Sequence, residues 1–201
     1  MTKRVVIAVI FLVIWTILIQ TNNIGWFDEP IYNFLISFEG YFLTRVMKIF
    51  SFFACDKFFA ALCVLFILCI LWKRFDSLYL MCTLFFAAGF NLILKDVFRR
   101  IRPDHLRLVT ETGYSYPSGH AMASMAFYGA ILVLVKHSDT KYKKVIFIST
   151  AILIFLIGVS RVYLGVHYPS DVIGGWVWAY LILVVLDYIV GGIREGIIKW
   201  R

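Results

Sequence analysis

Long apolar runs alternate with short polar stretches along most of this chain. Each run is near the roughly 20 residues that a helix needs to cross the hydrocarbon core of a bilayer. The six runs are about 4–21, 57–72, 77–98, 119–136, 144–162 and 170–191. The first could instead be a signal peptide, but its apolar core is long and no small-residue cleavage site follows it. The pattern predicts an all-α integral membrane protein with six transmembrane helices in one domain, 1–201.

The segment 27–55 departs from this pattern because charged residues recur among its many aromatic residues. No uncharged stretch of it is long enough to span a bilayer. Ile31, Phe34, Leu35 and Phe38 recur at helical spacing, which predicts an amphipathic helix. Aromatic residues are common at the membrane interface. We therefore expect 27–55 to form an interfacial helix between the first two spans.

The composition also favours a bilayer as the solvent. The chain is 62% hydrophobic and 16% charged, and its mean hydropathy is +0.86. A soluble domain of this size could not bury so much apolar surface. The net charge of +8 raises the alternative of nucleic-acid binding, but zinc-finger spacing, an RNP motif and a basic arm are all absent from the sequence. We expect no nucleic-acid partner and no obligate protein partner.

The basic residues suggest how the chain is oriented. Six spans would place both termini on one side, and Lys and Arg divide almost evenly between the two sides. The Lys3-Arg4 pair and the cluster of Lys141, Lys143 and Lys144 favour cytoplasmic termini in a plasma-membrane protein. The basic residues within 95–107 then lie on the extracytoplasmic side. Lys and Arg are usually enriched on the cytoplasmic side, so a basic cluster on the outer side indicates a function.

The first of three candidate motifs lies at the end of the third span. Lys95, Arg99 and Arg102 are spaced to share one helix face, and Pro103 is expected to end that helix. Cations stacked in this way repel one another unless an anion lies near them. The alternative is a basic collar whose side chains extend to the interface.

The second motif precedes the fourth span. Ser118 is a favourable N-cap residue, and Gly119 leaves backbone N–H groups open to close approach. A helix start of this kind binds anions, and His120 would stand at the edge of the bound anion. The alternative is an ordinary capped helix with an interfacial histidine.

The third motif joins the fifth and sixth spans. Arg161 closes the fifth span, His167 precedes the sixth, and Asp171 follows four residues later. A carboxylate near one ring nitrogen fixes the histidine tautomer and frees the other nitrogen to attack. A purely structural His–Asp pair is the alternative. All three motifs fall on the same side of the predicted membrane, which favours a common site.

These motifs resemble the type 2 phosphatidic acid phosphatase superfamily, which includes bacterial acid phosphatases and vanadium haloperoxidases. Lys95 with Arg102-Pro103 matches its K-x6-RP motif, 117–120 matches PSGH, and 160–171 matches SR-x5-H-x3-D. The layout is similar to bacterial PgpB-like membrane lipid phosphatases. The resemblance implies that this membrane protein has a helical core like that of acid phosphatases and vanadium haloperoxidases.

The resemblance also implies the role of each residue. His167 is the expected nucleophile and forms a phosphohistidine, Asp171 orients it, and His120 serves as acid and then base. Five residues would hold the phosphate oxygens: Lys95, Arg102, Ser118, Gly119 and Arg161. We expect no metal and no cofactor, since these cations supply the charge. Arg99 and Arg100 lie outside the family pattern and are expected to attract or position the headgroup.

The sequence leaves the substrate open. A lipid phosphate at the outer interface fits the site best, and the short 104–116 loop favours a modest headgroup. We favour phosphatidylglycerophosphate, followed by undecaprenyl pyrophosphate and phosphatidic acid. An anion transporter is the alternative from another class, but the charges gather at one surface, and only Asp187 stands out on the inner half. Haloperoxidase and soluble phosphatase roles fit such a small membrane chain poorly.

Overall fold

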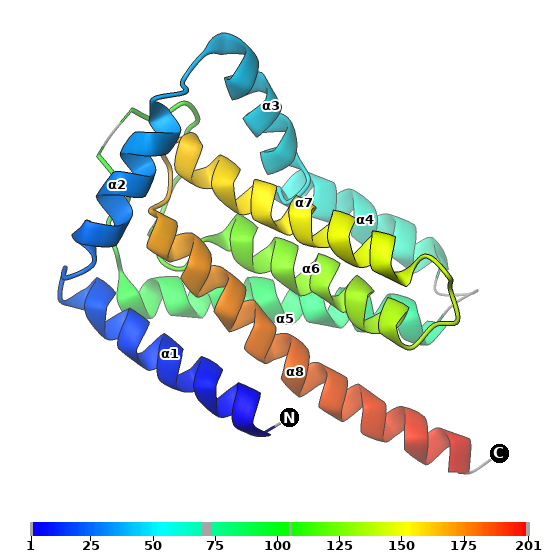
Figure 1. The fold of residues 1–201 in the computed structure, drawn as a ribbon. Helices are drawn as coiled ribbons and strands as arrows, with labels where there is room; N and C mark the ends of the chain where they lie inside the picture. Colours follow the sequence, from blue (N-terminus) through cyan, green and yellow to red (C-terminus); the bar gives the residue numbers. More distant parts are fainter. Residues whose placement is uncertain (1, 70–73, 105, 200–201) are drawn as a thin grey trace.

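The described part of the chain folds into eight helices that pack into one bundle (Figure 1). The computed structural model describes residues 2–69, 74–104 and 106–199. The helices are α1 (Thr2–Gln20), α2 (Gly25–Ile36), α3 (Tyr41–Phe52), α4 (Asp56–Cys69), α5 (Arg74–Phe98), α6 (Gly119–Lys136), α7 (Lys143–Tyr163) and α8 (Pro169–Lys199). The all-α prediction is confirmed.

Five helices, α1, α5, α6, α7 and α8, are long and apolar enough to cross a membrane. They correspond to the predicted spans 4–21, 77–98, 119–136, 144–162 and 170–191. The remaining predicted span, 57–72, contains α4, which has 14 residues. Residues 70–72 lie outside the described part of the chain. Five of the predicted spans therefore correspond to helices that could cross a membrane, and the sixth stays a prediction.

The expected single helix over 27–55 is wrong, because two helices occupy this segment. The α2 helix ends at Ile36, and the N–H group of Ser37 donates to the carbonyl of Asn33. The chain is extended at Gly40, with φ −176°, before α3 begins. Its N–H group donates to the hydroxyl of Tyr163 at the end of α7. This contact between distant segments fixes the corner between α2 and α3.

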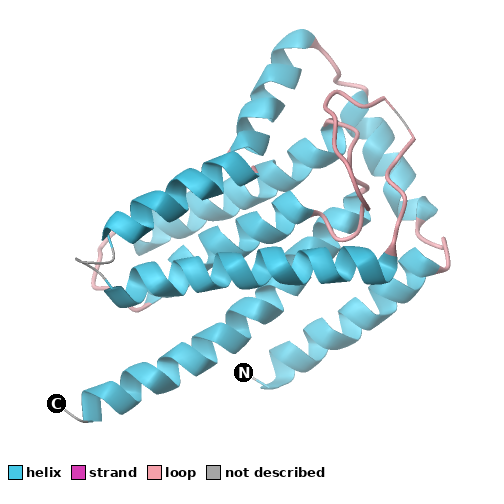
Figure 2. Ribbon diagram, turned by 180° about the vertical axis from the view of Figure 1, so that it is seen from behind, coloured by secondary structure: helices cyan, strands magenta, loops and turns pink. Residues whose placement is uncertain are grey.

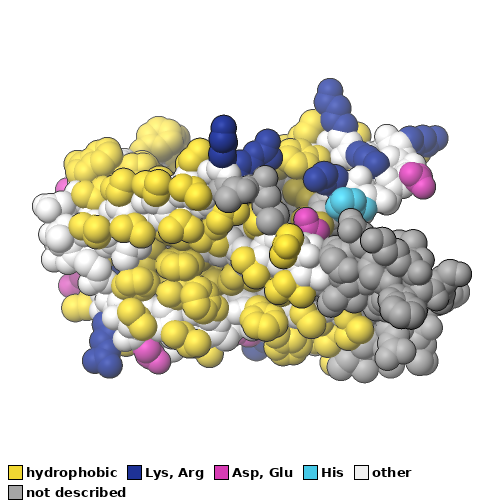
Figure 3. All heavy atoms as spheres, turned by 90° about the horizontal axis from the view of Figure 1, so that it is seen from below, with side chains coloured by type: hydrophobic (Ala, Val, Ile, Leu, Met, Phe, Trp, Pro, Cys, Tyr) yellow, Lys and Arg dark blue, Asp and Glu magenta, His cyan; other side chains and the backbone are white. Residues whose placement is uncertain are grey.

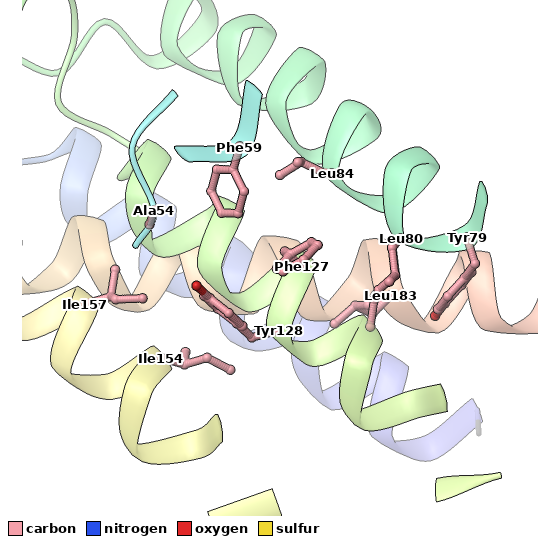
Figure 4. Packing of buried hydrophobic residues seen from close by; sticks show 11 residues of the cluster. Ala54, Phe59, Tyr79, Leu80, Leu84, Phe127, Tyr128, Ile154, Ile157 and Leu183 are labelled. Atoms are coloured by element: carbon pink, nitrogen blue, oxygen red, sulfur yellow. The ribbon is translucent and has the colours of Figure 1, made fainter. Parts of the chain in front are cut away.

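The α6 helix is the centre of the bundle and packs against α5, α7 and α8. Phe127 and Tyr128 of α6 meet apolar side chains from all three neighbours (Figure 4). Those partners include Leu80 and Leu84 of α5, Ile154 and Ile157 of α7, and Leu183 of α8. Small buried residues such as Ala126 let the helices approach closely, as is usual for helix pairs in membranes.

The outer surface of the bundle is strongly apolar. Only 11% of the α1 span is buried within the protein, and many large side chains along α1, α5 and α7 are exposed. Figure 3 shows one face on which apolar side chains cover most of the helices. Such a continuous apolar exterior is expected where lipid rather than water surrounds the protein.

The two ends of the bundle differ. Both termini and the loop before α7 lie at one end (Figure 1). The long irregular connection between α5 and α6 lies at the other end, beside the short connection between α7 and α8 (Figure 2). Because loop 137–142 and the termini share an end, the Lys141, Lys143 and Lys144 cluster lies on the same side as Lys3-Arg4.

Glycine permits close contact between α7 and α8. A Cβ atom added to Gly158 would lie 2.2 Å from Cζ2 of Trp176 and 2.6 Å from Cγ1 of Val172. Neither atom belongs to the free end of a flexible chain, so the helices would have to separate. This contact fixes the relative position of the two helices whose ends carry Arg161 and Asp171.

We expect Gly158→Ala to lower stability by about 1–3 kcal/mol, because overpacking forces the helices apart. The measurement is the Tm of the detergent-solubilised protein. Gly89→Ala on α5 is the matched control, since its added Cβ meets nothing within 4 Å. That control should hold or slightly raise the Tm, because alanine favours the helix. Equal losses in both variants would contradict the close packing of α7 on α8.

Candidate active site

The three sequence motifs meet at the loop end of the bundle. His120 begins α6, Arg161 lies in the last turn of α7, and Asp171 lies in the first turn of α8. The N–H group of Ser118 donates to the Asp171 carbonyl over 3.1 Å, which joins the starts of α6 and α8. His120 also interacts electrostatically with His167, Lys95, Arg102 and Arg161. The predicted convergence of distant segments is therefore observed.

The expected cationic helix face is wrong in detail. The α5 helix ends at Phe98, and Arg99 has a left-handed backbone with φ 47°. Its N–H group donates to the Lys95 carbonyl as the last helical hydrogen bond. A residue with positive φ commonly ends a helix in this way. Arg102 thus lies in the connection beyond the helix, while Lys95 remains on its last turn.

His167 is almost completely buried, with 2% of its surface exposed. Its Nε2 atom lies 3.2 Å from Nη1 of Arg102, and its Nδ1 atom lies 3.3 Å from Oγ of Ser115. A guanidinium only donates hydrogen bonds, so Nε2 must accept and the proton must be on Nδ1. This tautomer leaves a lone pair on Nε2, which is the atom able to attack an electrophile.

The Asp171 carboxylate explains how that tautomer is held. Its Oδ2 atom accepts hydrogen bonds from Oγ of Ser115 over 2.5 Å and from the N–H group of Tyr168 over 2.9 Å. The same oxygen lies 3.5 Å from Nδ1 of His167. Ser115 therefore stands between the two: it donates to Asp171 and can accept the Nδ1 proton of His167.

The charge state of His167 follows from its surroundings. Burial lowers the pKa of His167 to about 4, even though the hydrogen bond to Asp171 and its charge act in the opposite direction. The nearby cations Arg161 and Arg102 add to the lowering. At neutral pH the imidazole is uncharged and carries the lone pair that nucleophilic attack requires.

Three cations border the two histidines. Lys95 donates to the carbonyl of Tyr114 over 2.7 Å, and Arg102 donates to the carbonyls of Val166 and Thr112. Arg161 is 2% exposed and pairs with Glu111. The surplus of positive charge favours an anion between them.

Arg161 has a buried hydrogen-bond donor that an anion could use. It donates to the hydroxyl of Ser51 on α3 and to the Glu111 carboxylate, yet its buried Nε atom has no hydrogen-bond partner among the described residues. A buried charged donor without a partner is costly and therefore uncommon. A phosphate oxygen would satisfy it.

The start of α6 is formed as predicted. Ser118 caps the helix by accepting a hydrogen bond from the N–H group of Ala121. The side-chain amide of Asn91 on α5 donates to the Pro117 carbonyl over 3.0 Å and so holds the preceding turn. The first turn of a helix presents free N–H groups, to which Gly119 and His120 belong. They lie beside the cations described above.

Arg100 has partners that the sequence did not indicate. It was expected to attract or position the lipid headgroup, which stays a prediction, and its guanidinium bonds the carboxylates of Asp171 and Asp28 at 2.6 and 2.8 Å. Burial alone would lower the pKa of Arg100, but these two charges outweigh it and raise the pKa. Arg99 is exposed, so its expected role at the headgroup stays a prediction.

Other residues of the site carried little sequence signal. Asp28 was assigned to the interfacial segment, although it is 2% exposed and bonds Arg100 and Ser170. Glu111 and Ser51 pair with Arg161 from segments without a motif. Ser115 is the exception, because it lies close to the second motif, three residues before Ser118. The available hint for Asp28 was its place in the Asp28-Glu29 pair among the aromatic residues of α2.

Within the described ranges, no group of three or more His, Cys, Asp and Glu side chains could hold a metal ion. The expectation that the reaction needs no metal and no cofactor remains a prediction.

The fold is that of a multi-pass membrane protein in which the three motifs bring two histidines and several cations together at one end of the bundle. The sequence profile of the PAP2 superfamily matches residues 76–194, and the chain belongs to this superfamily. Phosphatidylglycerophosphatase B of Bacillus subtilis (strain 168) is 32% identical over 197 residues, which cover 96% of this chain and 95% of that protein.

Three further proteins are also similar to this chain. The crystal structure of a transmembrane PAP2-type phosphatidylglycerolphosphate phosphatase from Bacillus subtilis superposes with a TM-score of 0.83 and 30% identity, covering 98% of both chains. The Undecaprenyl-diphosphatase of Sulfolobus acidocaldarius is 40% identical over 79 residues, which cover 39% of this chain and 35% of that protein. The crystal structure of Aquifex aeolicus LpxE, at 21% identity and a TM-score of 0.62, shares the fold.

The low pKa of His167 gives a testable prediction. At pH 5 a free imidazole is almost wholly protonated, because its ordinary pKa is about 6.5. His167, with a pKa of about 4, should remain about nine-tenths neutral at this pH. Nitrogen-15 NMR of histidine-labelled protein can measure this, with His167→Asn to assign the signal. A His167 signal that titrates near pH 6.5 would contradict the buried, neutral imidazole.

Proposed function

We propose that this protein is a lipid phosphatase that cleaves a phosphate from a membrane lipid through a phosphohistidine on His167. The observation that carries the proposal is the placement of His167 Nε2 beside Arg102, with Lys95, Arg161 and His120 around the same point. The motifs are those of the PAP2 superfamily, to which the chain belongs.

In the first step His167 attacks phosphorus. The lone pair on Nε2 forms an N–P bond while the bond from phosphorus to the lipid oxygen breaks. His120, in its protonated form, gives a proton to the departing oxygen. Asp171 and Ser115 stabilise the positive imidazole ring through Nδ1, because the Asp171 carboxylate lies on that side. The lipid alcohol leaves from a phosphomonoester, or the lipid monophosphate from a diphosphate, and the transferred phosphate remains on His167.

In the second step water replaces the histidine. His120 now removes a proton from water, the oxygen attacks phosphorus, and the N–P bond breaks. Inorganic phosphate leaves, and His120 is again protonated, because it has regained the proton that it gave up in the first step. Through both steps Lys95, Arg102 and Arg161 face the equatorial oxygens, where the charge of the transferring group is spread. The Ser118 side chain and the Gly119 N–H group complete this cradle.

Phosphatidylglycerophosphate is the first substrate candidate. The relative named phosphatidylglycerophosphatase B matches almost the whole chain, including the helices before the motifs. Undecaprenyl diphosphate is the second candidate. It is supported by the relative named undecaprenyl-diphosphatase, whose likeness is higher in identity but limited to 79 residues. Either substrate places its phosphate at the interface and its tails in the bilayer.

The proposed site faces the extracytoplasmic side of the plasma membrane. Both termini and the loop containing Lys141 and Lys143 lie at the end away from the motifs (Figure 1). Lys and Arg near the ends of spans favour the cytoplasm. The α2 and α3 helices then lie at the outer interface, beside the site. No obligate protein partner and no nucleic acid enter this proposal.

We expect His167→Ala to abolish phosphate release, because the nucleophile is lost, while the protein still inserts and folds. Purified protein is assayed on phosphatidylglycerophosphate, undecaprenyl diphosphate and phosphatidic acid, and the highest kcat/KM identifies the substrate. His120→Asn should form the phosphoenzyme poorly and hydrolyse it slowly. Phosphate release by His167→Ala at near-normal rates would refute the assignment of the nucleophile.

We also expect full activity in excess EDTA, because Lys95, Arg102 and Arg161 supply the positive charge at the phosphate. Vanadate should inhibit in competition with substrate, since it mimics the five-coordinate phosphorus. The readout is the initial rate of phosphate release from detergent-solubilised lipid. Loss of activity in EDTA that is restored by a divalent cation would show that a metal takes part.

A further inference from the structure

A buried ion network joins the candidate catalytic carboxylate to a helix outside the three motifs. Arg100 donates through Nη1 to Oδ1 of Asp171 over 2.6 Å and through Nη2 to Oδ2 of Asp28 over 2.8 Å. Asp28 lies on α2, outside residues 76–194 that the family profile matches. The network therefore ties the site to a segment that the family motifs do not describe.

Asp28 has no freedom to turn in this network. Its Oδ1 atom accepts from the N–H group of Ser170 over 2.8 Å, and Oδ2 accepts from the Ser170 hydroxyl over 2.7 Å. Arg100 Nη1 also donates to that hydroxyl over 2.7 Å. Burial raises the pKa of Asp28, while these hydrogen bonds and the Arg100 charge act against the rise. One guanidinium thus stands between two carboxylates.

The geometry assigns a separate task to each oxygen of Asp171. Arg100 occupies Oδ1, so Oδ2 is left to receive Ser115 and Tyr168 and to face Nδ1 of His167. Arg100 is itself held from two further directions, because Asp28 takes its other amino group and the Tyr168 ring lies 4.0 Å from its Cζ atom. If Asp28 were lost, both amino groups of the Arg100 guanidinium would be free to turn toward Asp171.

We propose that Asp28 is a positioning residue for the reaction. It holds Arg100 in an orientation that directs Oδ2 of Asp171 toward His167. The proposal rests on the function proposed above, in which His167 is the nucleophile. Asp28 touches neither His167 nor the phosphate cradle in this network. Its loss should slow the attack on phosphorus and leave phosphate binding intact.

The first experiment is Asp28→Asn, which keeps the shape of the side chain and removes its charge. Single-turnover measurements should find formation of the phosphoenzyme slowed by about 10- to 100-fold, since misalignment of about 1 Å costs roughly this much. KM should stay within about twofold, because Lys95, Arg102 and Arg161 are untouched. Glu29→Gln, on the next residue of α2 and exposed, is the matched control and should keep the wild-type rate.

The second experiment is chemical rescue, which a merely structural role would not permit. A cavity of about 550 Å³ is lined by Asp28, Arg100 and Tyr168. In Asp28→Ala, formate can enter from this cavity and replace the lost carboxylate beside Arg100. Formate should restore a large part of the phosphoenzyme rate in Asp28→Ala, but none in Asp28→Asn, where an amide still fills the position. Wild type in formate measures any inhibition.

A third comparison tests whether Asp28 acts through Arg100. The double variant Asp28→Asn/Arg100→Gln should be no slower than Arg100→Gln alone, because the path from Asp28 to Asp171 is already cut. Additive losses in the double variant would overturn the proposal. So would a wild-type phosphoenzyme rate in Asp28→Asn or a failure of formate to rescue Asp28→Ala. If His167→Ala formed the same phosphoenzyme, the proposed function itself would fail instead.

Discussion

The buried carboxylate of Asp171 is the interaction on which the organisation of the site end depends. It receives hydrogen bonds from Arg100 after α5, Ser115 before α6 and Tyr168 before α8. A carboxylate without exposure to solvent must be paired, since an isolated buried charge is strongly unfavourable. The α5–α6 connection, which supplies Arg100 and Ser115, and the α7–α8 connection, which supplies Tyr168, therefore have to converge before this residue can be buried. The same convergence fixes the His167 tautomer, so folding of these loops and preparation of the nucleophile are one event.

Some cations at the site end of the bundle are paired with carboxylates, and others are not. Asp171 and Asp28 compensate Arg100, and Glu111 compensates Arg161. Lys95 and Arg102 are held mainly by backbone carbonyls, which orient a cation without neutralising it. The carboxylates thus lie behind the site, and the uncompensated positive charge lies beside the histidines.

The sequence predicted those features that depend on local pattern. Apolar runs gave α1, α5, α6, α7 and α8, because a bilayer-spanning helix needs only length and hydrophobicity. The N-cap at Ser118 was also predictable, since its chemistry is contained in a few neighbouring residues. The motifs predicted which histidines and cations lie near one another. They did not predict that α5 ends at Phe98, before Arg99 and Arg102.

The missed features depend on partners far away in the chain. Asp28 looked like an interfacial carboxylate because its partner Ser170 is 142 residues away. The turn between α2 and α3 was missed because the contact that fixes it, between Gly40 and Tyr163, is equally remote. Arg100 resembled one more surface cation in a basic cluster. Its burial between two carboxylates becomes visible only when three elements are placed together.

Packing of the apolar, membrane-spanning parts of the helices affects the chemistry at the helix ends. Charges in the hydrocarbon region are costly, so a phosphate site is favoured at the interface, where helix ends and loops also supply free N–H groups. Side chains on separate ends can act on one phosphorus atom only if the helices keep a fixed register. Close contacts such as Gly158 against Trp176, and Gly174 against the Tyr116 ring, prevent α8 from sliding past its neighbours. Because packing in membranes relies on such contacts rather than on expulsion of water, small residues deep in the bundle contribute to the alignment of His167 and Asp171.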